Sequence, residues 1–159
     1  IRYLKNEIPT IDESIQTYME ESLNAYLRGL NLSSTVMLGC ASEKAFLLLF
    51  EEYTNALSDP SKKNEFQQKT NLFIKKKIDA LRPEIEMLKK NKRLPKDISD
   101  DLEITFDGIG NFIRNCRNEV GHPTGRKIDR MLAFANLRLF VPYCKKVYTL
   151  IEFFKTNTV

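Results

Sequence analysis

The 159-residue sequence predicts a single all-helical domain spanning residues 1–159, folded as an up-and-down bundle of four to five helices. Two patterns support this class: apolar side chains recur at steps of three and four residues in several long segments, and no segment shows the alternation expected of a strand. Hydrophobic residues make up 42% of the chain and charged residues 29%. This is the composition of an ordinary globular protein, and the chain is long enough to bury a core.

The first two helices are predicted on either side of a turn at residues 31–34. The first begins at Ile11 or Asp12, a suitable cap, and continues to Leu30. The second runs from about Ser34, its expected serine cap, to Leu57. Because this second segment is apolar on nearly all sides, we expect it to be the central helix of the bundle.

The third helix is predicted from the break at 59–61 to about Lys90, with Pro83 bending or dividing it near Leu81 and Arg82. A fourth helix is expected to begin near Ser99, which with two following aspartates supplies a cap and acids for the helix dipole. This helix is expected to end at Gly121.

The last helix is predicted from Gly125 or Lys127 to Phe154, with a bend at Pro142. It carries much of the remaining apolar surface. The fourth and last helices therefore flank the segment that holds the most distinctive residues of the chain.

The formal charge is +4, which is compatible with a polyanionic partner. The basic segment at 89–96 carries Lys89, Lys90, Lys92 and Arg93 and no acid, and with the lysines at 75–77 it forms the most basic predicted surface. Clustered cations of this kind bind a phosphate backbone without sequence preference, so these residues are candidates for nucleic-acid binding. A simple solvated face is the alternative interpretation.

Cysteine usage and hydropathy indicate a cytoplasmic protein. Three scattered cysteines, Cys40, Cys116 and Cys144, fit neither a disulfide framework nor a zinc cluster, and we expect them to be buried free thiols. No apolar run close to the roughly 20 residues of a membrane span and no signal-peptide pattern is apparent, so no membrane association is expected. A lone histidine makes a metal site improbable, and no cofactor is expected.

The segment at 107–124, DGIGNFIRNCRNEVGHPT, holds the candidate active site. It contains Arg117, Asn118 and the only histidine, His122. Gly121 ends the predicted helix and Pro123 cannot continue it, so His122 can fold back toward the last helical turn. A permanent cation, an amide and a titratable ring can then converge on one anionic group.

This pattern resembles the RφxxxH motif of the HEPN superfamily, small helical domains found in many ribonucleases and in toxin-antitoxin or phage-defence proteins. Arg117 matches the motif arginine, Asn118 its polar position and His122 its histidine. The stretch from Val36 to Leu49 also looks like the early helix of such domains, which often carries a glutamate, here Glu43. The resemblance implies a homodimeric, metal-independent RNA endonuclease that leaves a 2′,3′-cyclic phosphate and a 5′-hydroxyl.

The residue types suit this reaction. His122 can transfer protons, Arg117 can hold two phosphate oxygens, and Asn118 can orient the ring or the phosphate. One histidine does not readily serve as acid and base in the same step, which favours two motifs meeting at a two-fold axis. Glu43 is expected either to hold Arg114 or Arg117 in place or to lie exposed on the surface.

Two alternatives remain open at this point. A HEPN-like domain can keep the motif to bind a nucleotide or RNA without cutting it. Alternatively the domain is structural or a dimerisation unit, with Arg117 paired to Glu119 or Glu43 and the Gly-His-Pro sequence acting only as a helix stop. A toxin would be accompanied by an antitoxin protein, such as a nucleotidyltransferase-like one.

Overall fold

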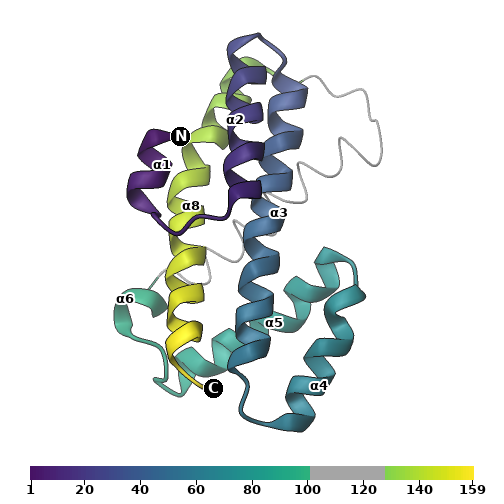
Figure 1. Cartoon of the computed structure of the whole chain (residues 1–159), viewed down its shortest axis with the longest axis vertical. Helices are drawn as coiled ribbons and strands as arrows, with labels where there is room; N and C mark the ends of the chain where they lie inside the picture. Colours follow the sequence, from purple (N-terminus) through teal and green to yellow (C-terminus); the bar gives the residue numbers. More distant parts are fainter. Residues whose placement is uncertain (101–127) are drawn as a thin grey trace.

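The computed structural model describes residues 1–100 and 128–159, and all regular secondary structure within them is helical (Figure 1). This confirms the all-α class. The elements are α1 (Arg2–Glu7), α2 (Glu13–Leu27), α3 (Asn31–Ala56), α4 (Pro60–Gln68), the 3-10 turn η1 (Lys69–Asn71), α5 (Ile74–Lys90), α6 (Lys96–Ser99) and α8 (Arg130–Thr156). The described residues thus contain more helices than the four to five expected, partly because α1 and α6 are short and were not predicted.

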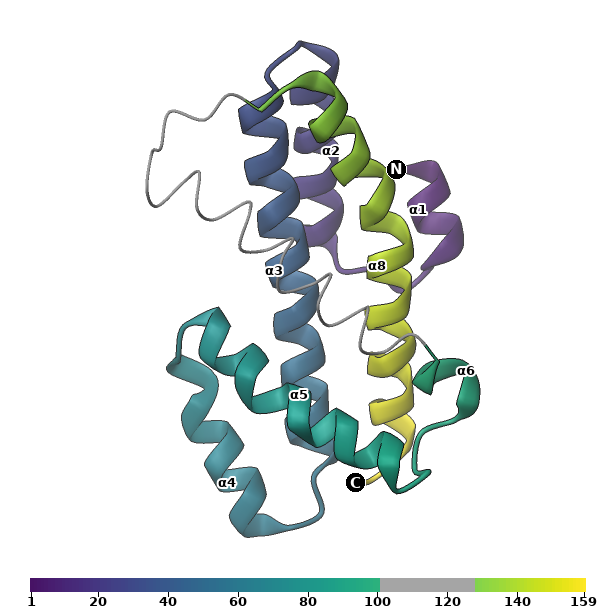
Figure 2. The ribbon, with the colours of Figure 1, turned by 180° about the vertical axis from the view of Figure 1, so that it is seen from behind.

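Helices α2, α3 and α8 lie side by side along the long axis of the molecule, with α3 packed against both of the others (Figures 1 and 2). Leu38, Ala45, Phe46 and Leu49 of α3 are all fully buried. The prediction of a central apolar helix is therefore confirmed. Truncating a core aromatic such as Phe46 to alanine typically costs about 3–5 kcal/mol, which indicates how strongly this helix holds the bundle together.

The connection between α2 and α3 is a tight turn at Gly29, whose φ of 76° is readily adopted only by glycine. Helix α3 begins at Asn31, earlier than predicted, and Ser34 is not its cap. The buried hydroxyl of Ser22 instead donates to the Ser34 carbonyl at 2.7 Å. Ser34 therefore takes part in a contact between α2 and α3 instead of capping α3.

Asp12 lies where three helices meet. Its carboxylate caps α2 by accepting a hydrogen bond from the Ser14 amide at 2.8 Å, as the sequence predicted. The same side chain lies 3.8 Å from the Lys44 ammonium of α3. Its backbone N–H donates to the hydroxyl of Tyr148 on α8 at 2.8 Å.

Of the two expected effects of Pro83, a bend or a division of the third helix, the division is wrong. Helix α5 runs through Pro83, which is exposed, while buried Leu81 and Ile85 on either side keep the helix packed on the core. The break falls instead at Leu72 and Phe73, whose backbones are extended. Neither residue is a glycine or proline, so the sequence carries no local signal for this break.

An aromatic cluster and its hydrogen bonds join α4 and α5 to the long helices α3 and α8. The ring of Tyr53 on α3 lies 5.1 Å from Phe66 of α4 and 5.3 Å from Phe154 of α8, centroid to centroid. The Tyr53 hydroxyl donates to the Glu84 carboxylate of α5 at 3.1 Å, and Lys62 of α4 pairs with the same carboxylate. Elements distant in sequence are thereby fixed around one buried side chain.

Helix α8 starts later than predicted. The Asp129 carboxylate accepts a hydrogen bond from the Leu132 amide at 2.7 Å and so caps the helix, which then continues through Pro142. At its far end, the Val159 amide donates to the carbonyl of Ala56 at the end of α3. Helices α3 and α8 are thus joined at this end (Figure 1).

The fourth helix predicted from the sequence lies outside the described residues, apart from its first positions. Ser99, its expected cap, is the last residue of α6 in this structure, and Asp100 after it is extended. The chain is described again from Ile128.

Among the described residues, one helix meets a length and composition criterion for crossing a membrane, contrary to the expectation that no apolar run came close. It is α3, with a mean hydropathy of 1.3 over its most apolar 18 residues. Half of that stretch is buried within the protein, and the core helix of a soluble protein meets the same criterion.

Candidate functional site

The catalytic residues expected from the sequence are Arg117, Asn118 and His122, with Arg114 as a supporting residue. All four lie outside the described residues. Their mutual arrangement therefore stays a prediction, and the structure bears on the site through the residues of α3, α5 and α8.

Glu43 is the expected site residue that the structure describes on α3. Its side chain is half-buried. This exposure lies between the two expectations from the sequence, a surface glutamate and a buried partner of an arginine. Cys40 lies one helical turn earlier and is also half-buried. Burial, and then the charge of the Glu43 carboxylate, raise the pKa of the Cys40 thiol above its usual value.

The expectation of buried free cysteines is met for Cys144. This thiol is fully buried in α8, and burial raises its pKa to about 12. Such a thiol is inert at neutral pH. Cys40 differs because it is only half-buried, and Cys116 lies outside the described residues.

The basic residues predicted to bind nucleic acid gather where α5 ends. Lys89, Lys90, Lys92 and Arg93 are all exposed. Lys92 adopts a positive φ of 55°, and the chain turns there toward α6. Among the described carboxylates, none forms an ion pair with Lys89, Lys90 or Lys92.

Arg93 has a structural role that sequence reasoning missed. Its guanidinium donates to the backbone carbonyl of Thr158 at 3.1 Å, next to the last residue of the chain. We define the basic cluster as Lys89, Lys90, Lys92 and Arg93. Within it, the three lysines form no ion pair with a described carboxylate, whereas Arg93 is held by the Thr158 carbonyl.

The lysines at 75–77 lie on α5 and differ in exposure. Lys75 and Lys76 are exposed, but Lys77 is only 8% exposed. The prediction that all three lysines contribute to one basic surface is therefore wrong for Lys77. On an α-helix, Lys77 falls three residues after Ile74 and four before Leu81, which places it on the core-facing stripe.

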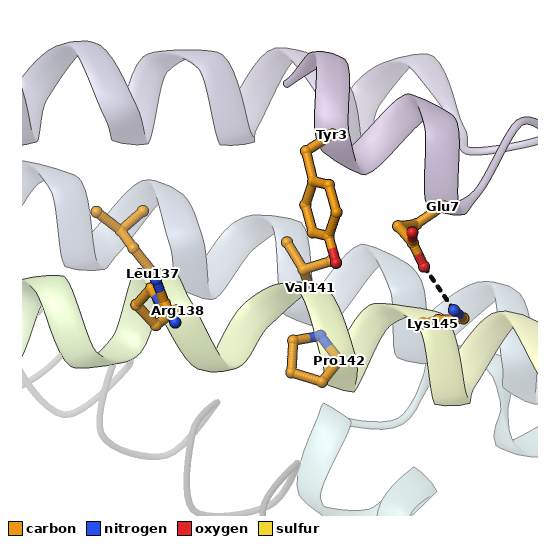
Figure 3. A pocket seen from close by; sticks show the side chains of 7 residues that line it. All are labelled: Tyr3, Glu7, Leu137, Arg138, Val141, Pro142 and Lys145. Carbon is orange, nitrogen blue, oxygen red and sulfur yellow. Dashed lines mark hydrogen bonds and ion pairs between the residues drawn. The ribbon is translucent and has the colours of Figure 1, made fainter.

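A hollow of about 690 Å³ lies between α1 and α8 (Figure 3). Its lining comprises Tyr3, Glu7, Leu137, Arg138, Val141, Pro142 and Lys145. Glu7 and Lys145 form a hydrogen-bonded ion pair across it. The hydrogen bond from Lys145 to the Glu7 carboxylate raises the pKa of Lys145. Helix α1 was not predicted from the sequence, although Leu4, Ile8 and Ile11 recur at steps typical of a packed segment.

A second hollow of about 380 Å³ lies among α3, η1 and α5 and the end of α4. Its lining combines apolar side chains of α3 with polar ones, and comprises Leu47, Phe50, Glu51, Thr54, Asn55, Gln67, Thr70 and Lys77. Within the described ranges, no group of three or more His, Cys, Asp or Glu side chains could hold a metal ion.

No protein-family model, curated protein or solved structure matches this chain. The functional assignment consequently rests on the chemistry of its own residues.

Proposed function

We propose that this protein is a metal-independent RNA endonuclease of the HEPN type that acts as a homodimer. The observation that carries the proposal is the sequence spacing of Arg117, Asn118 and the sole histidine His122, with Gly121 directly before the histidine as an expected helix stop. In a reaction that uses the RNA 2′-hydroxyl as nucleophile, one group must accept its proton, another must protonate the leaving oxygen, and cations must stabilise charge on phosphorus. Histidine and arginine supply these functions without a metal.

The described residues support this proposal in two ways. Glu43 lies half-buried on the central helix α3, and we expect its carboxylate to orient an arginine of the motif. The basic cluster leaves three exposed lysines without carboxylate partners among the described residues, and such lysines attract a phosphate backbone. A HEPN-like bundle, a toxin or phage-defence (abortive infection) role and an antitoxin partner belong to the same proposal.

The homodimer follows from the count of proton-transfer groups. The chain has one histidine, whereas in-line cleavage uses an acid and a base. Two chains related by a two-fold axis can supply one histidine each. Light scattering should therefore show a dimer at micromolar concentration, and a stable monomer would count against a composite site.

The decisive experiment is cleavage of single-stranded RNA by the purified protein in the presence of a metal chelator. We expect fragments with 2′,3′-cyclic phosphate and 5′-hydroxyl ends. Replacing His122 with alanine should reduce the rate by about 10²- to 10⁴-fold, as is typical for removing a proton-transfer group. Replacing Arg117 with alanine should also remove activity, because the cation that stabilises charge on phosphorus is lost.

The same variants separate the proposal from its alternatives. His122→Ala cutting as fast as the parent would remove the nuclease assignment. A parent that binds RNA or nucleotide through Arg117 without cutting would instead indicate a non-catalytic binding domain. Absence of both activities would leave a structural or dimerisation domain.

A further inference from the structure

Lys77 occupies a position where helix α5 otherwise buries apolar side chains. The buried residues of this helix are Ile74, Lys77, Leu81, Ile85 and Leu88, at steps of three or four. Lysine is among the residues least often buried, since its charge loses hydration unless a partner compensates. At 8% exposure the stem of Lys77 is buried in this stripe, while its ammonium nitrogen keeps contact with solvent, because it is not among the buried polar atoms that lack a hydrogen-bond partner.

The ammonium of Lys77 has no carboxylate partner among the described residues. Its ammonium nitrogen lies 5.8 Å from the centroid of the buried Phe50 ring, at the outer range of a cation–π contact. Within the described ranges, no carboxylate pairs with this ammonium and no hydrogen bond from it is present. The same side chain lines the 380 Å³ hollow, so a ligand that enters can meet it.

The rest of that hollow defines what such a ligand would look like. Leu47 and Phe50 supply apolar surface, and the side chains of Asn55, Gln67 and Thr70 supply polar groups nearer the exposed rim. An apolar pocket with a few polar groups, of a few hundred Å³, is the usual form of a small-molecule site.

We propose that this hollow, which we call the Lys77 pocket, binds a small organic monocarboxylate with an apolar body. The carboxylate would pair with Lys77, and the apolar body would pack on Leu47 and Phe50. Glu51 also lines the pocket and carries a negative charge, so a second charge on the ligand would be repelled. This selects a monoanion over a phosphate dianion. The lining of the pocket includes neither Arg117 nor His122, and the inference does not depend on the nuclease proposal.

The test uses phenylacetate, with its neutral isostere phenylacetamide and the dianion phenyl phosphate, followed by amide NMR shifts. Phenylacetate should give saturable shifts at the pocket residues of α3 and α5. It should bind more tightly than either analogue. Replacing Lys77 with methionine, which keeps the unbranched buried stem, should weaken phenylacetate binding by about tenfold or more, as expected for loss of a charged hydrogen bond.

Lys76→Met is the matched control, because it removes the same charge from the exposed neighbouring position. It should change phenylacetate binding by less than about twofold, since exposed charges are screened. Phenylacetamide should bind the parent and Lys77→Met alike, which shows that the variant is folded with its pocket intact.

Three results would overturn the proposal: no saturable shifts with phenylacetate, equal affinity in Lys77→Met, or tighter binding of phenyl phosphate than of phenylacetate. An unchanged melting temperature in Lys77→Met excludes unfolding as the cause of lost binding.

Discussion

The hydroxyl of Tyr143 on α8 donates a hydrogen bond to the backbone carbonyl of Ser42 on α3, with 2.8 Å between the two oxygens. Burial raises the pKa of Tyr143 well above its ordinary value. The bond links α8 to the central helix at Ser42, the residue before Glu43.

Replacing Tyr143 with phenylalanine should therefore lower the free energy of unfolding by about 1 kcal/mol, the usual net value of an intramolecular hydrogen bond. Urea unfolding measures this change. Tyr3→Phe is the control, because Tyr3 is 65% exposed, and it should change stability by no more than about 0.5 kcal/mol. Equal effects from the two variants would show that the Tyr143 bond contributes nothing.

Alkaline pH should destabilise the fold through its buried phenols. Burial raises the pKa of Tyr148 from 10.0 to about 12. The folded state thus favours the neutral phenol. The contribution of Tyr148 to the free energy of unfolding is fully present below about pH 10 and is lost as pH rises toward 12. Tyr148→Phe should flatten the decline of unfolding free energy by about 1.4 kcal/mol per pH unit in this range. An unchanged slope would contradict the assignment.

The basic cluster should contribute to RNA affinity through charge alone. In a His122→Ala background, which prevents cleavage, changing Lys89, Lys90 and Lys92 to glutamine should weaken single-stranded RNA binding. It should also reduce the slope of log affinity against log salt by up to about 2, at roughly 0.7 per phosphate contact. Fluorescence anisotropy at several salt concentrations measures both quantities.

The matched control for this triple variant changes Lys69, Lys145 and Lys155, each of which already pairs with a carboxylate. It removes the same net charge from elsewhere on the surface. A similar loss of affinity in both triple variants would indicate a general charge effect rather than a binding surface.

Arg117→Ala should abolish cleavage while changing the unfolding free energy by no more than about 0.5 kcal/mol, as expected for a side chain in a solvent-accessible cleft. Thermal and urea unfolding measured beside the cleavage rate separate the two effects. A loss of about 3–5 kcal/mol, suppressed when Glu43 is also replaced by glutamine, would instead indicate a buried ion pair between these residues.

The long helices could be predicted from the sequence because their apolar residues follow the helical period over many turns. The near-continuous apolar run that ends at Leu49 predicts α3, and the carboxylate of Asp12 predicts the start of α2. The break at Leu72 could not be predicted, because it contains no glycine or proline; α4 and α5 on its two sides each pack against α3.

The candidate site was predictable only in part. The sequence singled out Glu43, and the structure places it half-buried on the central helix. Lys77 was assigned to the surface because three consecutive lysines suggest a solvated face. The spacing from Ile74 and Leu81 would have placed it on the core side had the helix period been applied residue by residue. The motif residues Arg114, Arg117, Asn118 and His122 remain predictions.

The position of Asp12 also bears on how the protein folds. Its contacts reach Lys44 and Tyr148, so the polar groups at this junction are satisfied only when the two ends of the sequence have come together. Closing a loop of this length carries an entropic cost that must be met before the contacts it permits are formed. We therefore expect helices α2 and α8 to form as one cooperative unit. Local unfolding of either helix would expose polar groups of the other at this junction.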